Sequence, residues 1–90
     1  MKHALTALVL LASPAQAACY ADYKAKQDDP LRLHYGVVEI SEPCNRNNAR
    51  SQLERRLDGT GWQLLNVVSV FDESGLDERR GSAGNFFLRF

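Results

Sequence analysis

The sequence lacks most of the features that mark larger or more specialised proteins. Its 90 residues include two cysteines, three prolines, one tryptophan and two histidines, and the formal net charge is zero. A chain without a basic excess is not expected to bind nucleic acid or an anionic membrane through its overall charge. It also has no glycine-rich phosphate loop, no HExxH motif and no GxSxG motif. We therefore expect no cofactor, no metal centre, no nucleic-acid partner and no assignable catalytic residue.

The one long apolar run lies at the start of the chain and is too short to span a membrane. Ala4–Ala12 follows a weakly basic start, and Ala15 and Ala17 are the small residues that a signal peptidase reads. A membrane-spanning helix needs about 20 apolar residues. The pattern predicts a signal peptide over residues 1–17 and export, most simply to a bacterial periplasm, with no stable membrane span left in the mature chain.

Cys19 has a second interpretation, as a lipid-modified first residue of the mature protein. Such a signal has a large aliphatic residue three positions before the cysteine, where this chain has Gln16. A lipoprotein is therefore the less favoured alternative. Cleavage after Ala17 leaves 73 of the 90 residues, one domain with a small hydrophobic core.

The two cysteines supply stability that a domain of this size needs. An even cysteine count in a small exported chain indicates a disulfide, here between Cys19 and Cys44. Closing a loop of about 25 residues stabilises the fold by roughly 3 kcal/mol in the chain-entropy model. The spacing is unlike Cys-x-x-Cys, and His34 is the one imidazole of the mature chain, so a metal or redox pair is disfavoured. The disulfide would tether an N-terminal segment, residues 18–30.

Two patterns in the next part of the chain predict a strand and a helix. Apolar and polar residues alternate over 31–40, and the phase changes at Gly36, where we expect a β-bulge. Apolar residues recur every four positions over 45–58: Ala49, Leu53 and Leu57. They form one stripe, which predicts a helix with one face packed on a sheet. Segment 18–30, by contrast, is polar and shows no clear alternation.

The stretch 62–71 predicts the central strand of that sheet. It reads WQLLNVVSVF, with apolar residues on both faces and turn residues at both ends. We expect Trp62 to be largely buried. A polar loop over 72–85 leads to a final strand over 85–90, which would pair antiparallel with 62–71. The predicted fold is α+β: a β-α-β-β domain over 31–90, with a three-stranded sheet, one helix on one face and a right-handed crossover between the first two strands.

Two short motifs carry a resemblance to a known family. Residues 35–40 read YGVVEI, and Gly61-Trp62-Gln63-Leu64 follows the predicted helix. The arrangement resembles a family of small bacterial domains of unknown function, with a Tyr-x-Val-Val strand, a short helix and a Gly-Trp-Glu-Leu strand motif. Gln63 stands where that family has Glu, and the loop before the last strand is longer here. The resemblance implies the β-α-β-β fold and no particular activity.

Candidate functional residues are few. His34 is a weak site candidate, as a base with nearby carboxylates. One helix cannot cover both faces of a three-stranded sheet, so the other face is expected to be an interaction surface. Its expected members are Tyr35, Val67, Phe71 and Phe87. The sequence thus favours a non-catalytic binding or interaction module, which pairs with another protein or with a second copy. The alternative is a small periplasmic enzyme or metal-dependent accessory protein that uses His34.

Overall fold

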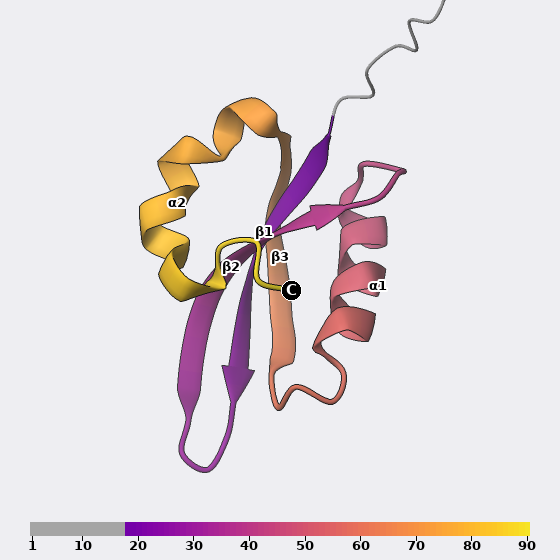
Figure 1. The fold of residues 1–90 in the computed structure, drawn as a ribbon. Coiled ribbons are helices and arrows are strands. Elements are labelled where there is room, and N and C mark those ends of the chain that lie inside the picture. Colours follow the sequence, from indigo (N-terminus) through magenta and orange to yellow (C-terminus); the bar gives the residue numbers. More distant parts are fainter. Residues whose placement is uncertain (1–17) are drawn as a thin grey trace, which may run out of the picture.

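A three-stranded antiparallel sheet forms the centre of the protein in the computed structural model, which describes residues 18–90 (Figure 1). The strands are β1 (Cys19–Gln27), β2 (Arg32–Ile40) and β3 (Gln63–Asp72), in the spatial order β2-β1-β3. Helix α1 (Arg46–Leu57) packs on one face of the sheet, called the α1 face, and α2 (Asp77–Ala83) packs on the other, called the α2 face. Two 3₁₀ turns flank α2, at Glu73–Gly75 and Gly84–Phe86.

The order of elements is β-β-α-β-α, so the predicted β-α-β-β order is wrong. Segment 18–30 contains a strand, β1, and this strand is central because it pairs antiparallel with both β2 and β3. The predicted central strand, β3, is an edge strand. Because β2 and β3 both pair antiparallel with β1, they run parallel to each other on either side of it, and α1 forms the crossover between them. The sequence of β1 shows no clear alternation of apolar and polar residues, because its core-facing side chains are mostly small. These side chains are Cys19, Ala21, Tyr23 and Ala25.

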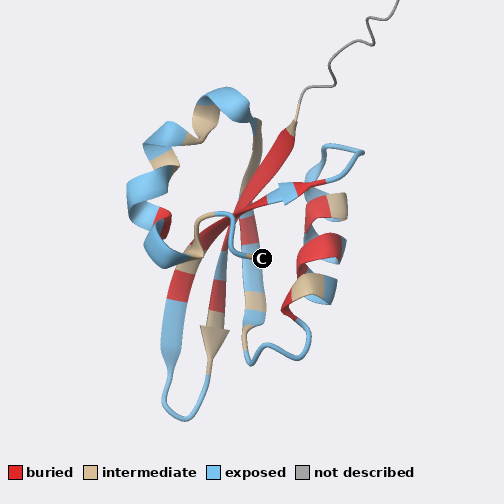
Figure 2. Cartoon of the chain, viewed as in Figure 1, coloured by how far each residue is buried: buried red, intermediate tan, exposed pale blue. Residues whose placement is uncertain are grey.

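The hydrophobic core lies between α1 and the sheet (Figure 2). The predicted helical stripe of Ala49, Leu53 and Leu57 is confirmed, since all three side chains are buried there. The Asn45 side chain caps the helix by accepting a hydrogen bond from the Asn48 N–H. The buried core cluster contains Cys19, Ala21, Tyr23, Ala25, Val38, Ile40, Ala49, Leu53, Leu57 and Val67.

Two β-bulges in β3 decide which of its side chains reach this core. The β1–β3 register shifts twice, and each shift leaves one extra residue on β3, first Leu65 and then Val68. Leu64, Val67 and Val70, spaced by three residues, therefore all pack toward α1. Simple alternation had placed Val67 on the opposite face from Leu64. Each extra bulge residue shifts the residues beyond it by one position and so moves their side chains to the opposite face of the sheet, which explains this error.

Gly36 does not mark the predicted bulge, because the β1–β2 register runs through it without a shift. Gly36 instead marks a place where the Tyr23 side chain comes close to the backbone of β2. A Cβ atom at this position would lie 2.5 Å from the Tyr23 hydroxyl oxygen and 2.6 Å from Tyr23 Cζ. Gly36 thus leaves the space in which the Tyr23 ring lies against β2.

The predicted loop over 72–85 holds α2, and the predicted strand over 85–90 does not form. Residues 84–90, called the C-terminal segment, lie along the free edge of β2 instead of pairing with β3. Phe87 makes one isolated parallel bridge with Val37, and the Leu88 N–H donates to the Val37 carbonyl at 2.8 Å. Positive φ angles at Gly84 (54°) and Leu88 (56°) turn the chain and prevent an extended strand.

The predicted disulfide is confirmed between Cys19 and Cys44, with Cα atoms 5.8 Å apart. It joins the start of β1 to the loop before α1. The predicted signal peptide, residues 1–17, lies outside the described residues. Within 18–90, neither helix has the length and apolar composition that crossing a bilayer requires.

Candidate functional site

The imidazole of His34 lies among four aromatic rings on the α1 face, and we call this group the His34 cluster. Phe86 stacks on the imidazole with 3.7 Å between ring centroids and 6° between the planes. Trp62 and Tyr23 meet it edge-on, at 4.3 Å and 5.3 Å, and Phe90 lies at 6.2 Å. Trp62, predicted to be largely buried, is half-buried at the margin of the core. The chain thus brings together β1, β2, the residue before β3 and the C-terminal segment.

The His34 cluster stabilises a neutral imidazole. His34 is 8 % exposed, its Nε2 lies 2.9 Å from the Tyr23 hydroxyl, and its buried Nδ1 has no hydrogen-bond partner among residues 18–90. Burial, with a contribution from the positive charge of Arg89, lowers the pKa of His34 to about 4. Burial also raises the pKa of Tyr23 to about 12. An enclosed imidazole of such low basicity, with no bonded carboxylate, is poorly suited to general-base catalysis.

The α2 face holds a second buried group, the Asp22 cluster. Ser69 Oγ, the Tyr35 hydroxyl and Arg79 Nε donate to the Asp22 carboxylate at 2.6, 2.7 and 3.0 Å. Burial alone would raise the pKa of Asp22, but these hydrogen bonds and the Arg79 charge hold it below its usual value. Burial, with the hydrogen bond to Asp22, raises the pKa of Tyr35 to about 12. The guanidinium of Arg79 also lies 3.9 Å from the Phe71 ring centroid, so one side chain fixes α2 to the sheet.

The four residues of the predicted interaction surface do not form one exposed patch. Val67 is 2 % exposed and lies under α1, because of the bulges in β3. Tyr35, Phe71 and Phe87 are half-buried. The unexpected helix α2 supplies the cover, since its arginines stack on the rings of Phe71 and Phe87.

Part of the α2 face stays open near the β1–β2 hairpin, and we call it the leucine face. Leu33 is 66 % exposed and Leu65 is 46 % exposed, and both line a hollow of about 280 Å³ together with Lys24 and Tyr35. Leu65 is one of the two bulge residues of β3. Sequence alternation could have located both leucines, since it places Leu65 on the opposite face of its strand from Leu64, but it does not show that β2 and β3 lie on either side of β1.

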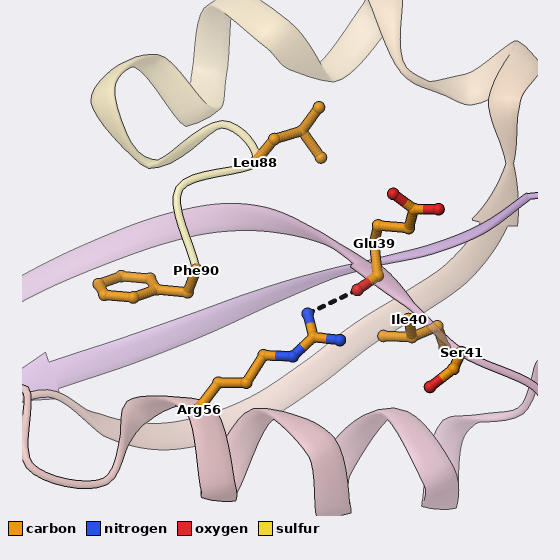
Figure 3. A pocket seen from close by; sticks show the side chains of 6 residues that line it. All are labelled: Glu39, Ile40, Ser41, Arg56, Leu88 and Phe90. Atoms are coloured by element: carbon orange, nitrogen blue, oxygen red, sulfur yellow. Dashed lines mark hydrogen bonds between the residues drawn. The ribbon is translucent and has the colours of Figure 1, made fainter.

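A wider hollow of about 440 Å³ lies between the end of β2, α1 and the C-terminal segment (Figure 3). Its lining residues are Glu39, Ile40, Ser41, Arg56, Leu88 and Phe90. Arg56 donates hydrogen bonds to the Glu39 carbonyl, drawn in Figure 3, and to Gln52 Oε1. This cation is therefore already engaged by the chain itself.

The fold and these clusters define a small disulfide-bonded α+β domain. Among residues 18–90, no group of three or more His, Cys, Asp or Glu side chains is placed to hold a metal ion. In the disulfide, neither Cys19 nor Cys44 retains a thiol for a metal or for a lipid thioether. No family model, no curated protein and no solved structure matches the chain. The family resemblance therefore stays a prediction.

Proposed function

We propose that this chain is an exported, periplasmic interaction module without catalytic function, which binds protein through the leucine face. The observation that carries the proposal is the pair of exposed leucines, Leu33 and Leu65, beside one hollow. A single exposed leucine is ordinary in a soluble domain. Two leucines from different strands around one hollow form an apolar patch, a feature typical of interaction sites.

The disulfide supports the exported location. Structural disulfides persist in oxidising compartments such as the periplasm and are rare in the bacterial cytosol. The Cys19–Cys44 bond staples a domain whose core is small, which agrees with the signal peptide predicted over residues 1–17.

The simplest partner is a second copy of this chain. The leucine face carries Lys24, which forms no ion pair among residues 18–90, and the adjoining β1–β2 turn carries Asp29 and also Asp28, whose carboxylate lies 3.3 Å from Lys26 Nζ. In an antiparallel two-fold arrangement, each acidic turn approaches the lysine of the other copy. Apolar contact and opposite charges would then act together in an isologous interface.

The geometry does not favour the alternative of an enzyme built on His34. Its imidazole is enclosed by rings and hydrogen-bonds to Tyr23 rather than to a carboxylate. The buried carboxylate of Asp22 lies on the other face of the sheet and is engaged by three donors.

Sedimentation of the mature chain at tens of micromolar tests the proposal. We expect a dimer for the wild type and a monomer for the double variant Leu33→Lys/Leu65→Lys, because two lysines would oppose their copies across the interface. Leu88→Lys, which changes an exposed leucine of the other hollow, serves as the matched control and should remain dimeric.

A monomeric wild type would overturn the second copy as partner. A dimer that survives the double substitution, with an unchanged circular dichroism spectrum, would overturn the leucine face as the interface.

A further inference from the structure

The C-terminal segment, residues 84–90, closes the His34 cluster. Of the four rings around the imidazole, Tyr23 belongs to β1 and Trp62 directly precedes β3. The other two, Phe86 and Phe90, belong to the C-terminal segment. Half of the enclosure therefore comes from β1 and the residue that enters β3, and half comes from the C-terminal segment.

Few backbone interactions hold this segment in place. It contacts the β2 edge through the single bridge at Val37, with one hydrogen bond from the Leu88 N–H. Leu88 has φ +56°, a left-handed conformation that disfavours a bulky side chain. The closed position therefore depends strongly on side-chain packing, to which the Phe86–His34 stack contributes. β1, in contrast, is paired on both sides and tethered by the disulfide.

The enclosure fits a neutral imidazole and not a charged one. A protonated imidazole has two N–H donors. Nε2 can donate to the Tyr23 hydroxyl, but Nδ1 is buried with no acceptor among residues 18–90. A buried charged donor without an acceptor is strongly unfavourable, so the protonated ring needs contact with water.

The charged groups around the cluster do not supply a counter-ion. Tyr23 is the titratable group that β1 presents to His34, and the C-terminal segment contributes the cation Arg89. Helix α1, on the same face, contributes a second cation, Arg56, beside Phe90 in the hollow of Figure 3. No carboxylate hydrogen-bonds to the imidazole within residues 18–90.

We propose that residues 84–90 form an acid-sensitive latch, which opens when protonation of His34 releases Phe86 and Phe90 from the sheet. Opening admits water to Nδ1 and uncovers the edge of β2 at Val37 while the sheet stays intact. The imidazole has a pKa of about 4 when closed and about 6.5, its ordinary value, when exposed. The closed form is therefore fully favoured above about pH 6.5 and loses that advantage as the pH falls toward 4.

Amide hydrogen exchange of the mature chain, followed residue by residue by NMR, tests the latch. The protection factor of the Leu88 amide, corrected for the intrinsic rate, should fall about 60-fold between pH 7 and about pH 4.5, given the two pKa values. The amides of β1 should stay protected over the same range.

Two variants separate the role of His34 from other effects of acid. His34→Phe keeps an aromatic ring and His34→Gln does not, but neither side chain titrates, so both should keep the Leu88 protection constant. Asp72→Asn removes an exposed carboxylate and should retain the wild-type transition.

Three results would overturn the latch. The first is constant Leu88 protection in the folded wild type down to about pH 4.5. The second is the same loss of protection in either folded non-titrating variant. The third is loss of Leu88 and β1 protection together, which would mean global unfolding rather than release of one segment.

Discussion

The two faces of the sheet each bury a titratable side chain, and they stabilise it in opposite ways. On the α1 face, His34 is surrounded by rings, and burial outweighs every other influence on its pKa. On the α2 face, Asp22 is only 4 % exposed, yet three donors, one of them the cation Arg79, hold its pKa below the usual value. Burial favours the neutral form of either group. Hydrogen-bond partners decide whether the charged form nevertheless persists.

The difference also assigns separate roles to the two faces. The Asp22 cluster is fully paired and fixes α2 through Arg79. The His34 cluster leaves one ring nitrogen unpaired and is closed by a weakly attached segment. The first arrangement is rigid over a wide pH range, and the second is sensitive to acid. Substitutions and changes of pH test this difference between the two faces.

Asp22→Ala should have the largest effect on stability. It leaves Ser69 and Tyr35 without their shared acceptor, and it leaves the partly buried guanidinium of Arg79 with the exposed carboxylate of Glu78 and the Gly75 carbonyl as its partners. Removing one partner of a buried ion pair costs roughly 3–5 kcal/mol. Urea unfolding measures the change, and Glu54→Ala, at an exposed carboxylate of α1 with no side-chain hydrogen bond or ion pair among residues 18–90, is the control. A loss below about 1 kcal/mol would show that α2 is held by its apolar contacts instead.

Gly36→Ala should have an intermediate effect, on the α1 face. The added methyl group would overlap the Tyr23 ring, and such overpacking costs about 1–3 kcal/mol. Gly81→Ala is the matched control, since a Cβ there meets nothing within 4 Å in helix α2. Gly81→Ala should raise the free energy of unfolding by about 0.5–1 kcal/mol, as measured by thermal unfolding. Equal melting temperatures for the two variants would contradict the close approach of Tyr23 to β2.

Lowering the pH to about 4.5 should affect the His34 cluster and leave the Asp22 cluster unchanged. The folded pKa of Asp22 lies below 3.8, so its contribution is present above that pH and is lost only as the pH falls through the lower folded value. At about pH 4.5, the NMR resonances of Arg79 Nε and Ser69 should therefore keep their neutral-pH positions. Movement of these signals together with Leu88 would show that both faces respond to acid as one unit.

Several features of the fold could be predicted from local patterns. The stripe of Ala49, Leu53 and Leu57 predicted α1, because helical periodicity follows from backbone geometry alone. Cysteine count and domain size predicted the disulfide. Turn residues around 62–71 predicted β3 within one residue at each end. Each of these inferences depends on residues that are close together in the sequence or on the number of cysteines.

Other features depended on contacts between distant residues. β1 pairs with two strands, but its inward alanines gave little hydrophobic signal before those partners were known. The short helix α2 has a polar sequence, DERRGSA, and owes its place to Arg79 reaching Asp22, 57 residues earlier. The final apolar run FFLRF has the pattern of a strand, but positive φ angles at Gly84, just before the run, and at Leu88, in its middle, turn it onto β2.

The candidate site was likewise predictable from the sequence only in part. His34 was identifiable as the one imidazole of the mature chain, but its environment was not, since the surrounding rings come from positions 23, 62, 86 and 90. The bulges in β3 moved Val67 into the core, whereas simple alternation from Leu64 places it on the opposite face. A bulge has no reliable local signature when no glycine marks it. The leucine face became visible only with the strand order.

The disulfide, helix α1 and the strands at 31–40 and 62–71 follow from local sequence, because periodicity and residue chemistry are properties of adjacent positions. Strand order, the faces of β3 and the partners of His34 and Asp22 are set by the folded chain. These depend on register and on long-range packing, where a shift of one residue exchanges inside for outside.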